Sequence, residues 1–132
     1  MGAPAAKQGD AVIGTDIHIV LVPAAAPVPT PLPHVFSGTL KGGLASSVKI
    51  AGAAAATQDS TADNSPPHIP TPPGTSFQQP PANKGTVMMG SATVKIGGKA
   101  AARAGDPVRT CNDPADLPAG SIVAAGTVFV GG

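Results

Sequence analysis

The sequence predicts a small all-β domain built from three copies of one short pattern. Seventeen glycines and sixteen prolines occur among 132 residues, and there is no glutamate, tryptophan or tyrosine. Because proline and glycine interrupt helices, a largely helical protein is excluded. Short runs of β-branched residues end in glycine pairs, which is typical of β-hairpins. Few large apolar side chains are available for a core, so we expect a slim, tapering body, a small cone or pyramid of short hairpins.

Two patterns recur along the chain. Ser-Val-Lys-Ile-Ala-Gly at 47–52 returns as Thr-Val-Lys-Ile-Gly-Gly at 93–98 and as Thr-Val-Phe-Val-Gly-Gly at 127–132. Three copies in so short a chain indicate pseudo-threefold internal repeats.

The second pattern is Ala-Arg-Ala-Gly-Asp at 102–106, which matches Ala-Lys-Gln-Gly-Asp at 6–10. A degraded copy at 56–60 has Asp59 and Ser60 in place of Gly and Asp. We interpret Asp10 and Asp106 as carboxylates that cap turns. The repeats divide a single domain, 1–132, into units of about 6–52, 56–98 and 102–132.

Two proline-rich stretches interrupt this organisation. Pro23 to Pro33 holds five prolines in eleven residues, and Ser65 to Pro81 holds seven. Such stretches are either flexible polyproline linkers or rigid loops wrapped on the β body. A histidine follows the first (His34) and lies within the second (His68), which favours ordered loops.

The chain's soft metal donors are His18, His34, His68 and Cys111. His18 lies twelve residues after Ala6, and His68 lies twelve after Ala56, its counterpart in the next repeat. Cys111 follows the third counterpart by nine residues. Threefold folding would therefore bring one donor per repeat to a shared apex, with His34 as the fourth.

Three imidazoles and one thiolate suit a single tetrahedral Zn²⁺, and four protein donors make it a structural site. A small body with few large side chains also needs such a staple. Alternatively, His18 is a surface residue of a strand and Cys111 is a small buried apolar residue.

Charge and hydropathy exclude several classes of protein. The formal net charge is +1, and eight Lys and Arg are scattered rather than clustered, which argues against nucleic-acid binding. No apolar run is long enough for a membrane span, so we expect no stable membrane insertion.

The residues from Ala100 to Asp106, their two partial copies and the three hairpin segments resemble those of PAAR-repeat proteins. These are the cone-shaped tips of type VI secretion systems and of related extracellular contractile injection systems. The resemblance covers nearly all of the chain, and no toxin domain accompanies it, so we expect a bare tip. It implies a zinc site at His18, His34, His68 and Cys111.

The resemblance also implies partners and a location. One monomer would cap a trimeric VgrG-like spike protein through the base of the cone, and effector cargo is a possible further partner. Val94, Ile96, Val128 and Val130 are candidate base residues. The protein would be made and assembled in the cytoplasm and would act at the tip of a secreted or extracellular phage-tail-like apparatus, where it helps to puncture the target envelope. This role is structural and involves no enzyme activity.

Two other functions are compatible with parts of the sequence. A small zinc-dependent hydrolase would need an open coordination position and a general base, for which Asp16 is the nearby carboxylate. A disordered proline- and alanine-rich linker or matrix protein would lack stable β structure.

Overall fold

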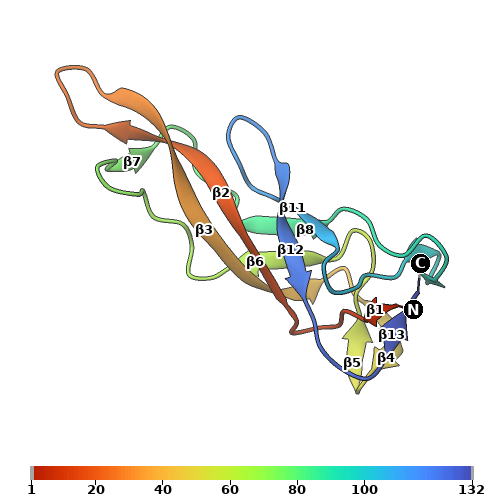
Figure 1. Ribbon diagram of the computed structural model, residues 1–132. Helices are drawn as coiled ribbons and strands as arrows, with labels where there is room; N and C mark the ends of the chain where they lie inside the picture. Colours follow the sequence, from red (N-terminus) through yellow and green to blue (C-terminus); the bar gives the residue numbers. More distant parts are fainter. Residues whose placement is uncertain (1, 132) are drawn as a thin grey trace.

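The computed structural model describes residues 2–131 and contains strands but no helix in that range (Figure 1), as the sequence predicts. The two ends of the predicted domain, Met1 and Gly132, lie outside the described residues. Within the described part, no helix has the length and apolarity that crossing a membrane requires. In chain order the strands are β1 (Ala3–Pro4), β2 (Ala11–Val22), β3 (Val28–Gly42), β4 (Ala45–Ile50), β5 (Ala53–Ala55), β6 (Thr61–Asn64), β7 (Ser76–Phe77), β8 (Lys84–Val87), β9 (Lys95–Ile96), β10 (Lys99–Ala100), β11 (Pro107–Thr110), β12 (Leu117–Val123) and β13 (Phe129–Val130).

The centre of the molecule is a closed antiparallel sheet. Its order is β12-β11-β8-β6-β3-β2, and β12 also pairs with β2, which closes the ring. Side chains from these strands fill the interior, and Phe36 and Leu40 from β3 are the largest that are fully buried. Gly85 packs closely against Phe36. A Cβ added at Gly85 would stand 3.2 Å from the Phe36 ring and 2.9 Å from Val108, so a larger residue would not fit. The glycine thus makes room for the aromatic ring.

The longest element is the hairpin of β2 and β3, which pair from Ala11 opposite Thr39 to Val22 opposite Val28. The short hairpins that the sequence predicts are present elsewhere, in β4 with β5 and β9 with β10, but this long one is not predicted. The expected loop over Pro23 to Pro33 is wrong for most of its length. Most of this proline-rich stretch is strand, since Pro29, Pro31 and Pro33 belong to β3. Proline is tolerated there because it lies on a strand edge that donates no ladder hydrogen bond. The hairpin extends well beyond the ring (Figure 1).

At the opposite end lie three small two-stranded sheets, which pair β1 with β13, β4 with β5, and β9 with β10 (Figure 1). The last two are hairpins, whereas β1 and β13 come from the two ends of the chain. Three alanines join them in a cycle of backbone hydrogen bonds. Ala6 N–H donates to Ala102 O (2.9 Å), Ala102 N–H to Ala56 O (3.0 Å), and Ala56 N–H to Ala6 O (3.0 Å). All three are buried, so only small side chains fit around this axis. The cycle is the clearest expression of the threefold repeat.

The degraded repeat copy keeps the turn geometry of the other two. Asp59 has a φ of 75°, close to 91° for Gly9 and 85° for Gly105 at the matching positions. A non-glycine residue pays a steric cost in this left-handed conformation. The tertiary fold therefore imposes the turn where the local sequence does not favour it.

Ser60 also takes over the capping role of the aspartates in this copy. Its Oγ accepts the Thr57 N–H at 2.9 Å, as the Asp106 carboxylate accepts the Arg103 N–H at 2.7 Å. The Asp10 carboxylate accepts the Lys7 N–H at 2.9 Å in the remaining copy. The interpretation of Asp10 and Asp106 as turn caps is confirmed.

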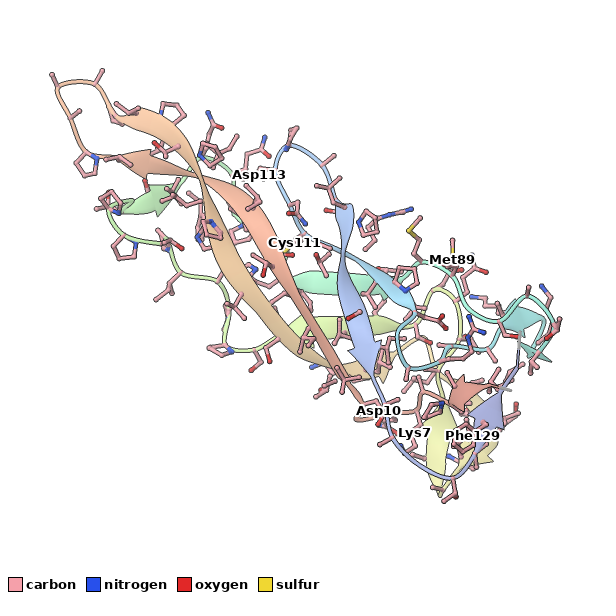
Figure 2. All side chains as sticks on the ribbon, viewed as in Figure 1. Lys7, Asp10, Met89, Cys111, Asp113 and Phe129 are labelled. Carbon is pink, nitrogen blue, oxygen red and sulfur yellow. The ribbon has the colours of Figure 1, made fainter. Side chains whose placement is uncertain are left out.

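The end formed by the three small two-stranded sheets is called the base below. Of the predicted base residues, Val130 is buried, Val94 and Ile96 are partly buried, and Val128 is exposed. The side chain of Phe129 projects at this end (Figure 2) and is 59% exposed. The base therefore presents both aliphatic and aromatic surface.

Candidate metal site

The predicted donors lie partway along the long hairpin. Asp16 and His18 are two residues apart on β2, and both are buried. Because side chains alternate between the faces of a strand, both point to the inner face of β2. His34 on β3 pairs with Asp16 across the hairpin. His68 arrives from the proline-rich loop after β6, and Cys111 directly follows β11. Four separate segments thus meet at one place.

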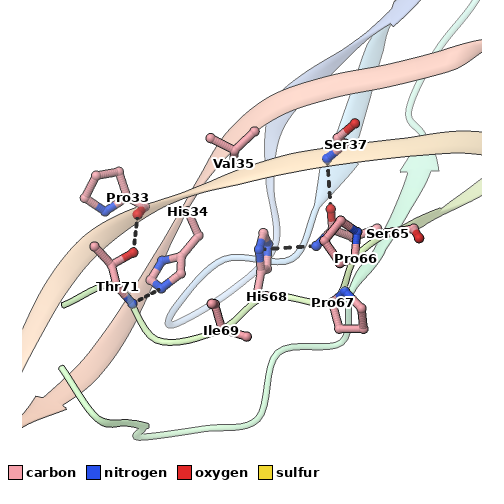
Figure 3. Close-up of a pocket in the computed structure, with 11 residues that line it drawn as sticks. Pro33, His34, Val35, Ser37, Ser65, Pro66, Pro67, His68, Ile69 and Thr71 are labelled. Atoms are coloured by element: carbon pink, nitrogen blue, oxygen red, sulfur yellow. Dashed lines mark hydrogen bonds between the residues drawn. The ribbon is translucent and has the colours of Figure 1, made fainter.

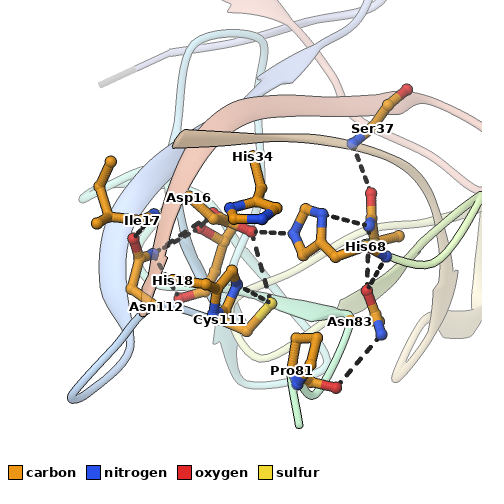
Figure 4. A network of polar contacts seen from close by, with 12 residues as sticks. Asp16, Ile17, His18, His34, Ser37, His68, Pro81, Asn83, Cys111 and Asn112 are labelled. Atoms are coloured by element: carbon orange, nitrogen blue, oxygen red, sulfur yellow. Dashed lines mark hydrogen bonds and ion pairs between the residues drawn. The ribbon is translucent and has the colours of Figure 1, made fainter. Parts of the chain in front are cut away.

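Four side chains have donor atoms within 4.8 Å of one another: Asp16, His18, His68 and Cys111. Asp16 Oδ2 lies 2.8 Å from His68 Nε2 and 3.5 Å from Cys111 Sγ (Figure 4). Cys111 Sγ lies 3.6 Å from His18 Nε2. A carboxylate, two imidazoles and a thiol so close together can bind a metal ion.

His34 lies beside this group with its ring nitrogens turned to the backbone. Its ring centre is 5.4 Å from that of His18 and 5.5 Å from that of His68. Nδ1 donates to Leu32 O at 2.9 Å, and Nε2 accepts the Thr71 N–H at 3.1 Å. The structure therefore brings three of the four predicted donors together and places the fourth next to them, with other partners.

A groove of about 380 Å³ runs along the outer side of His34 and His68 (Figure 3). Its walls are largely apolar and include Val35 and Ile69, both strongly exposed. The Thr71 hydroxyl donates to Pro33 O at 2.8 Å, which ties the proline-rich loop to β3. The groove borders the donor cluster, whereas the cluster itself is buried.

A second layer of side chains orients His68. The Asn64 carbonyl oxygen accepts the Ser37 N–H at 2.8 Å, so the Asn64 amide nitrogen must face His68 Nδ1, 3.2 Å away. Asn83 Oδ1 accepts the His68 backbone N–H at 2.8 Å. His68 Nε2 is thereby directed into the cluster.

Asp16 and His18 are also held in place from behind. The Thr110 hydroxyl donates to Asp16 Oδ1, and Asn112 Nδ2 approaches the same oxygen at 3.4 Å. His18 Nδ1 has no hydrogen-bond partner among the described residues and faces Asp113 Oδ2 at 3.5 Å. An imidazole with a carboxylate behind one nitrogen is the usual arrangement of a metal-binding histidine.

Burial sets the charge state of the cluster. It raises the pKa of the Cys111 thiol to about 11, with a further contribution from the negative charge of Asp16. Burial also lowers the pKa of His34. Without a cation the thiol keeps its proton, and a metal ion must displace that proton to bind sulfur. Metal uptake therefore releases protons and strengthens as the pH rises.

Asp16 is the member of the cluster that the sequence does not identify as a donor. Its only predicted role is that of a general base in a hydrolase. The signal is nevertheless present, because Asp16 and His18 are two residues apart and strand alternation places both on one face. The cluster also lies four residues before the end of β2, whereas the repeat pattern predicts donors at the very apex.

Residues 78–132 match the family model of the PAAR motif. This part of the chain is similar to the PAAR motif. The match includes Cys111 and the signature from Ala100 to Asp106, while the three histidines and two earlier signature copies precede it. No curated protein matches the chain.

PAAR-motif proteins sit on the spike of secretion machinery, which supports a spike protein as the partner of this chain. The family is structural rather than enzymatic. The threefold base, the donor cluster and the long hairpin are three separate features on which a function of this protein can rest.

Proposed function

We propose that this protein is the tip of a contractile injection machine, where a single copy caps a trimeric, VgrG-like central spike. The observation that carries the proposal is the hydrogen-bonded cycle of Ala6, Ala56 and Ala102, beside which three similar two-stranded sheets lie. A monomer with threefold internal symmetry can make similar contacts with each chain of a trimer. Residues 1–132 would act as one domain composed of three units.

The base supplies suitable contact surface for such a partner. Val48 and Val128 are exposed at matching positions of two repeats, and Phe129 stands where the other repeats have Lys49 and Lys95. Aromatic side chains often provide the largest single contribution to a protein interface. We expect Phe129 to be the main anchor on the spike.

The donor cluster would hold one structural Zn²⁺. His18, His68 and Cys111 are three of the proposed ligands, and His34 and Asp16 compete for the fourth position. Thiolate and imidazole donors together favour zinc over magnesium or calcium. The ion would join β2, the proline-rich loop and the end of β11, which are far apart in sequence. Such a crosslink would help a slim body to resist the load of puncturing an envelope.

A zinc hydrolase is the second candidate, and the position of Asp16 bears on it. A hydrolase needs an open coordination position and a base that reaches a bound water. The Asp16 carboxylate is fully buried and already contacts His68, Thr110 and Cys111. These contacts favour a closed, structural site, so we propose that the protein is not an enzyme.

The proposal also covers assembly and cargo. The tip would be assembled on its spike in the cytoplasm and leave the cell with the apparatus. Effector cargo would then have the sides of the body available, since the base is occupied.

Binding to the spike trimer tests the proposal. The full chain is mixed with the trimeric spike protein of its own machine, and the stoichiometry and affinity are measured by native mass spectrometry and calorimetry. We expect one chain per trimer, and we expect Phe129→Asp to weaken binding by at least about tenfold. Val35→Asp is the matched control, because Val35 is also exposed but lies on the long hairpin. Absence of binding by the wild-type chain would refute the proposed role.

A further inference from the structure

The long hairpin carries an apolar face of which most side chains are exposed, while Ile19 and Leu21 are half-buried. Strand register places Ile17 opposite Pro33, Ile19 opposite Pro31, and Leu21 opposite Pro29, so these side chains share one face. Val35 continues it toward the ring and is 75% exposed. We call this surface the outer face of the arm. It is defined by Ile17, Ile19, Leu21, Pro29, Pro31, Pro33 and Val35.

The end of the molecule that bears this face contains almost no charge. Residues 17–40, which include the whole arm, contain no Asp, Glu, Lys or Arg. Neither do residues 64–83, which include the proline-rich loop packed against the arm's inner side. All eight basic and all seven acidic residues lie outside these two segments. The nearest acidic residues are Asp16, which is fully buried on the inner face of β2, and Asp113 and Asp116 on the loop after β11.

The backbone of β2 has its outward hydrogen bonds satisfied along the arm. Ile17 N–H donates to Asn112 Oδ1 at 2.7 Å, and Ile19 N–H donates to Asp113 Oδ2 at 2.8 Å. The carbonyl oxygens of Ile17, Ile19 and Leu21 accept backbone N–H groups from Asp113, Gln78 and Thr75. This edge of the arm therefore offers few free polar groups.

Prolines remove the outward donors from the other edge. Because Ile17, Ile19 and Leu21 direct their backbone groups away from β3, their partners in the antiparallel pair direct theirs away from β2. Those partners are Pro33, Pro31 and Pro29, none of which has an N–H group. Another strand cannot pair well with such an edge. An apolar surrounding, in contrast, has fewer N–H groups to desolvate.

These features distinguish between possible occupants of the outer face. A typical protein interface includes about one hydrogen bond per 100–200 Å² and a polar rim, which this face does not supply. A nucleic acid requires positive charge. An uncharged apolar face beside a donor-poor edge fits the boundary between lipid headgroups and acyl chains. The arm also lies at the far end from the base (Figure 1), so both surfaces can be used together.

We propose that the arm binds a lipid bilayer surface through its outer face and its apolar turn, Pro23–Pro27. The depth is shallow, roughly 5–10 Å, as for other interfacial elements, because an open two-stranded sheet cannot span hydrocarbon. The biological setting rests on the proposed tip function, which brings this end to an envelope. The binding itself requires neither spike nor zinc chemistry, so the two proposals can fail separately.

Vesicle flotation with the full chain tests the arm directly. The probes are vesicles of phosphatidylcholine alone and of phosphatidylcholine mixed with phosphatidylglycerol. We expect binding to both, with little dependence on salt, because the arm is uncharged. The double variant Val28→Asp/Val35→Asp changes the residue that directly follows the turn and one residue of the outer face. It should bind at least about tenfold more weakly, since charge is costly at an apolar boundary. Both positions are at least half exposed, and circular dichroism with metal analysis verifies that the variant is folded.

Phe129→Asp is the matched control, because it adds the same charge to an exposed apolar residue at the base. It should bind vesicles like the wild type while losing the spike. The absence of tryptophan allows a single reporter as a second measurement: Ala25→Trp fluorescence should shift to the blue with vesicles, and Phe129→Trp fluorescence should not. Failure of the wild type to bind phosphatidylcholine vesicles overturns the proposal, as does equal binding by the double variant. If the occupant of the arm is a protein instead, the wild type will fail to bind the vesicles.

Discussion

Replacing Asp16 and His34 separately decides which side chain completes the metal site. Asp16→Asn keeps the shape of the side chain and its contacts with Thr110 and Asn112, but it removes the charge that faces His68 and Cys111. His34→Ala removes an imidazole whose nitrogens already bond to Leu32 O and the Thr71 N–H. If the observed arrangement is the binding arrangement, the aspartate change should matter more.

The expected size follows from the number of donors. A structural zinc site contributes about 10–16 kcal/mol, which divided over four donors is about 2.5–4 kcal/mol each. Since about 1.4 kcal/mol corresponds to a factor of ten, loss of one donor weakens binding roughly 60- to 700-fold. We expect Asp16→Asn and His68→Ala to fall in that range. His34→Ala should weaken binding by less than about tenfold, because its loss affects only the packing beside the cluster.

Competition with a chromophoric chelator measures zinc affinity over this range, and the visible spectrum of the Co²⁺ form reports the donor set. Asp63→Asn is the matched control, because Asp63 is an exposed carboxylate that pairs with Lys41 at 3.0 Å on the protein surface. Its zinc affinity should equal that of the wild type. The reasoning is refuted if His34→Ala loses a hundredfold while Asp16→Asn loses nothing. In that case the His34 ring must leave its two backbone partners to bind the metal.

Two further predictions concern stability, measured by chemical denaturation of the metal-loaded protein. Asp59→Gly should stabilise the fold by about 0.5–1 kcal/mol, because Asp59 has a φ of 75° and its ion pair with Lys99 is exposed; a destabilised variant would contradict the assigned turn. Phe36→Ala should cost about 3–5 kcal/mol, because the ring is fully buried inside the closed sheet. Val35→Ala, its exposed neighbour, should change stability by no more than about 0.5 kcal/mol, and similar losses at the two positions would rule out the alternation of β3.

Local sequence was sufficient to predict the β class and the threefold repeat. The hairpin segments have glycine pairs where the turns need positive φ, as at Gly97 and Gly98, and such signals depend only on neighbouring residues. The signature copies likewise indicated the capped turns at Asp10 and Asp106. The long hairpin was not predictable in this way, because prolines normally indicate loops. Their place in β3 depends on pairing with β2, whose apolar run is itself ambiguous.

The sequence by itself determined which imidazole and thiol donors this protein has available for a metal, since it contains one cysteine and three histidines. Only the tertiary structure decided how they are arranged. Asp16 meets His68 across 52 positions of sequence and Cys111 across 95, and no local pattern encodes distances of that kind. The same holds for Asp59, which adopts a glycine-like turn because the two other repeats and the closed sheet fix the path of its backbone. Local propensities select the elements, whereas long-range packing selects which side chains face one another.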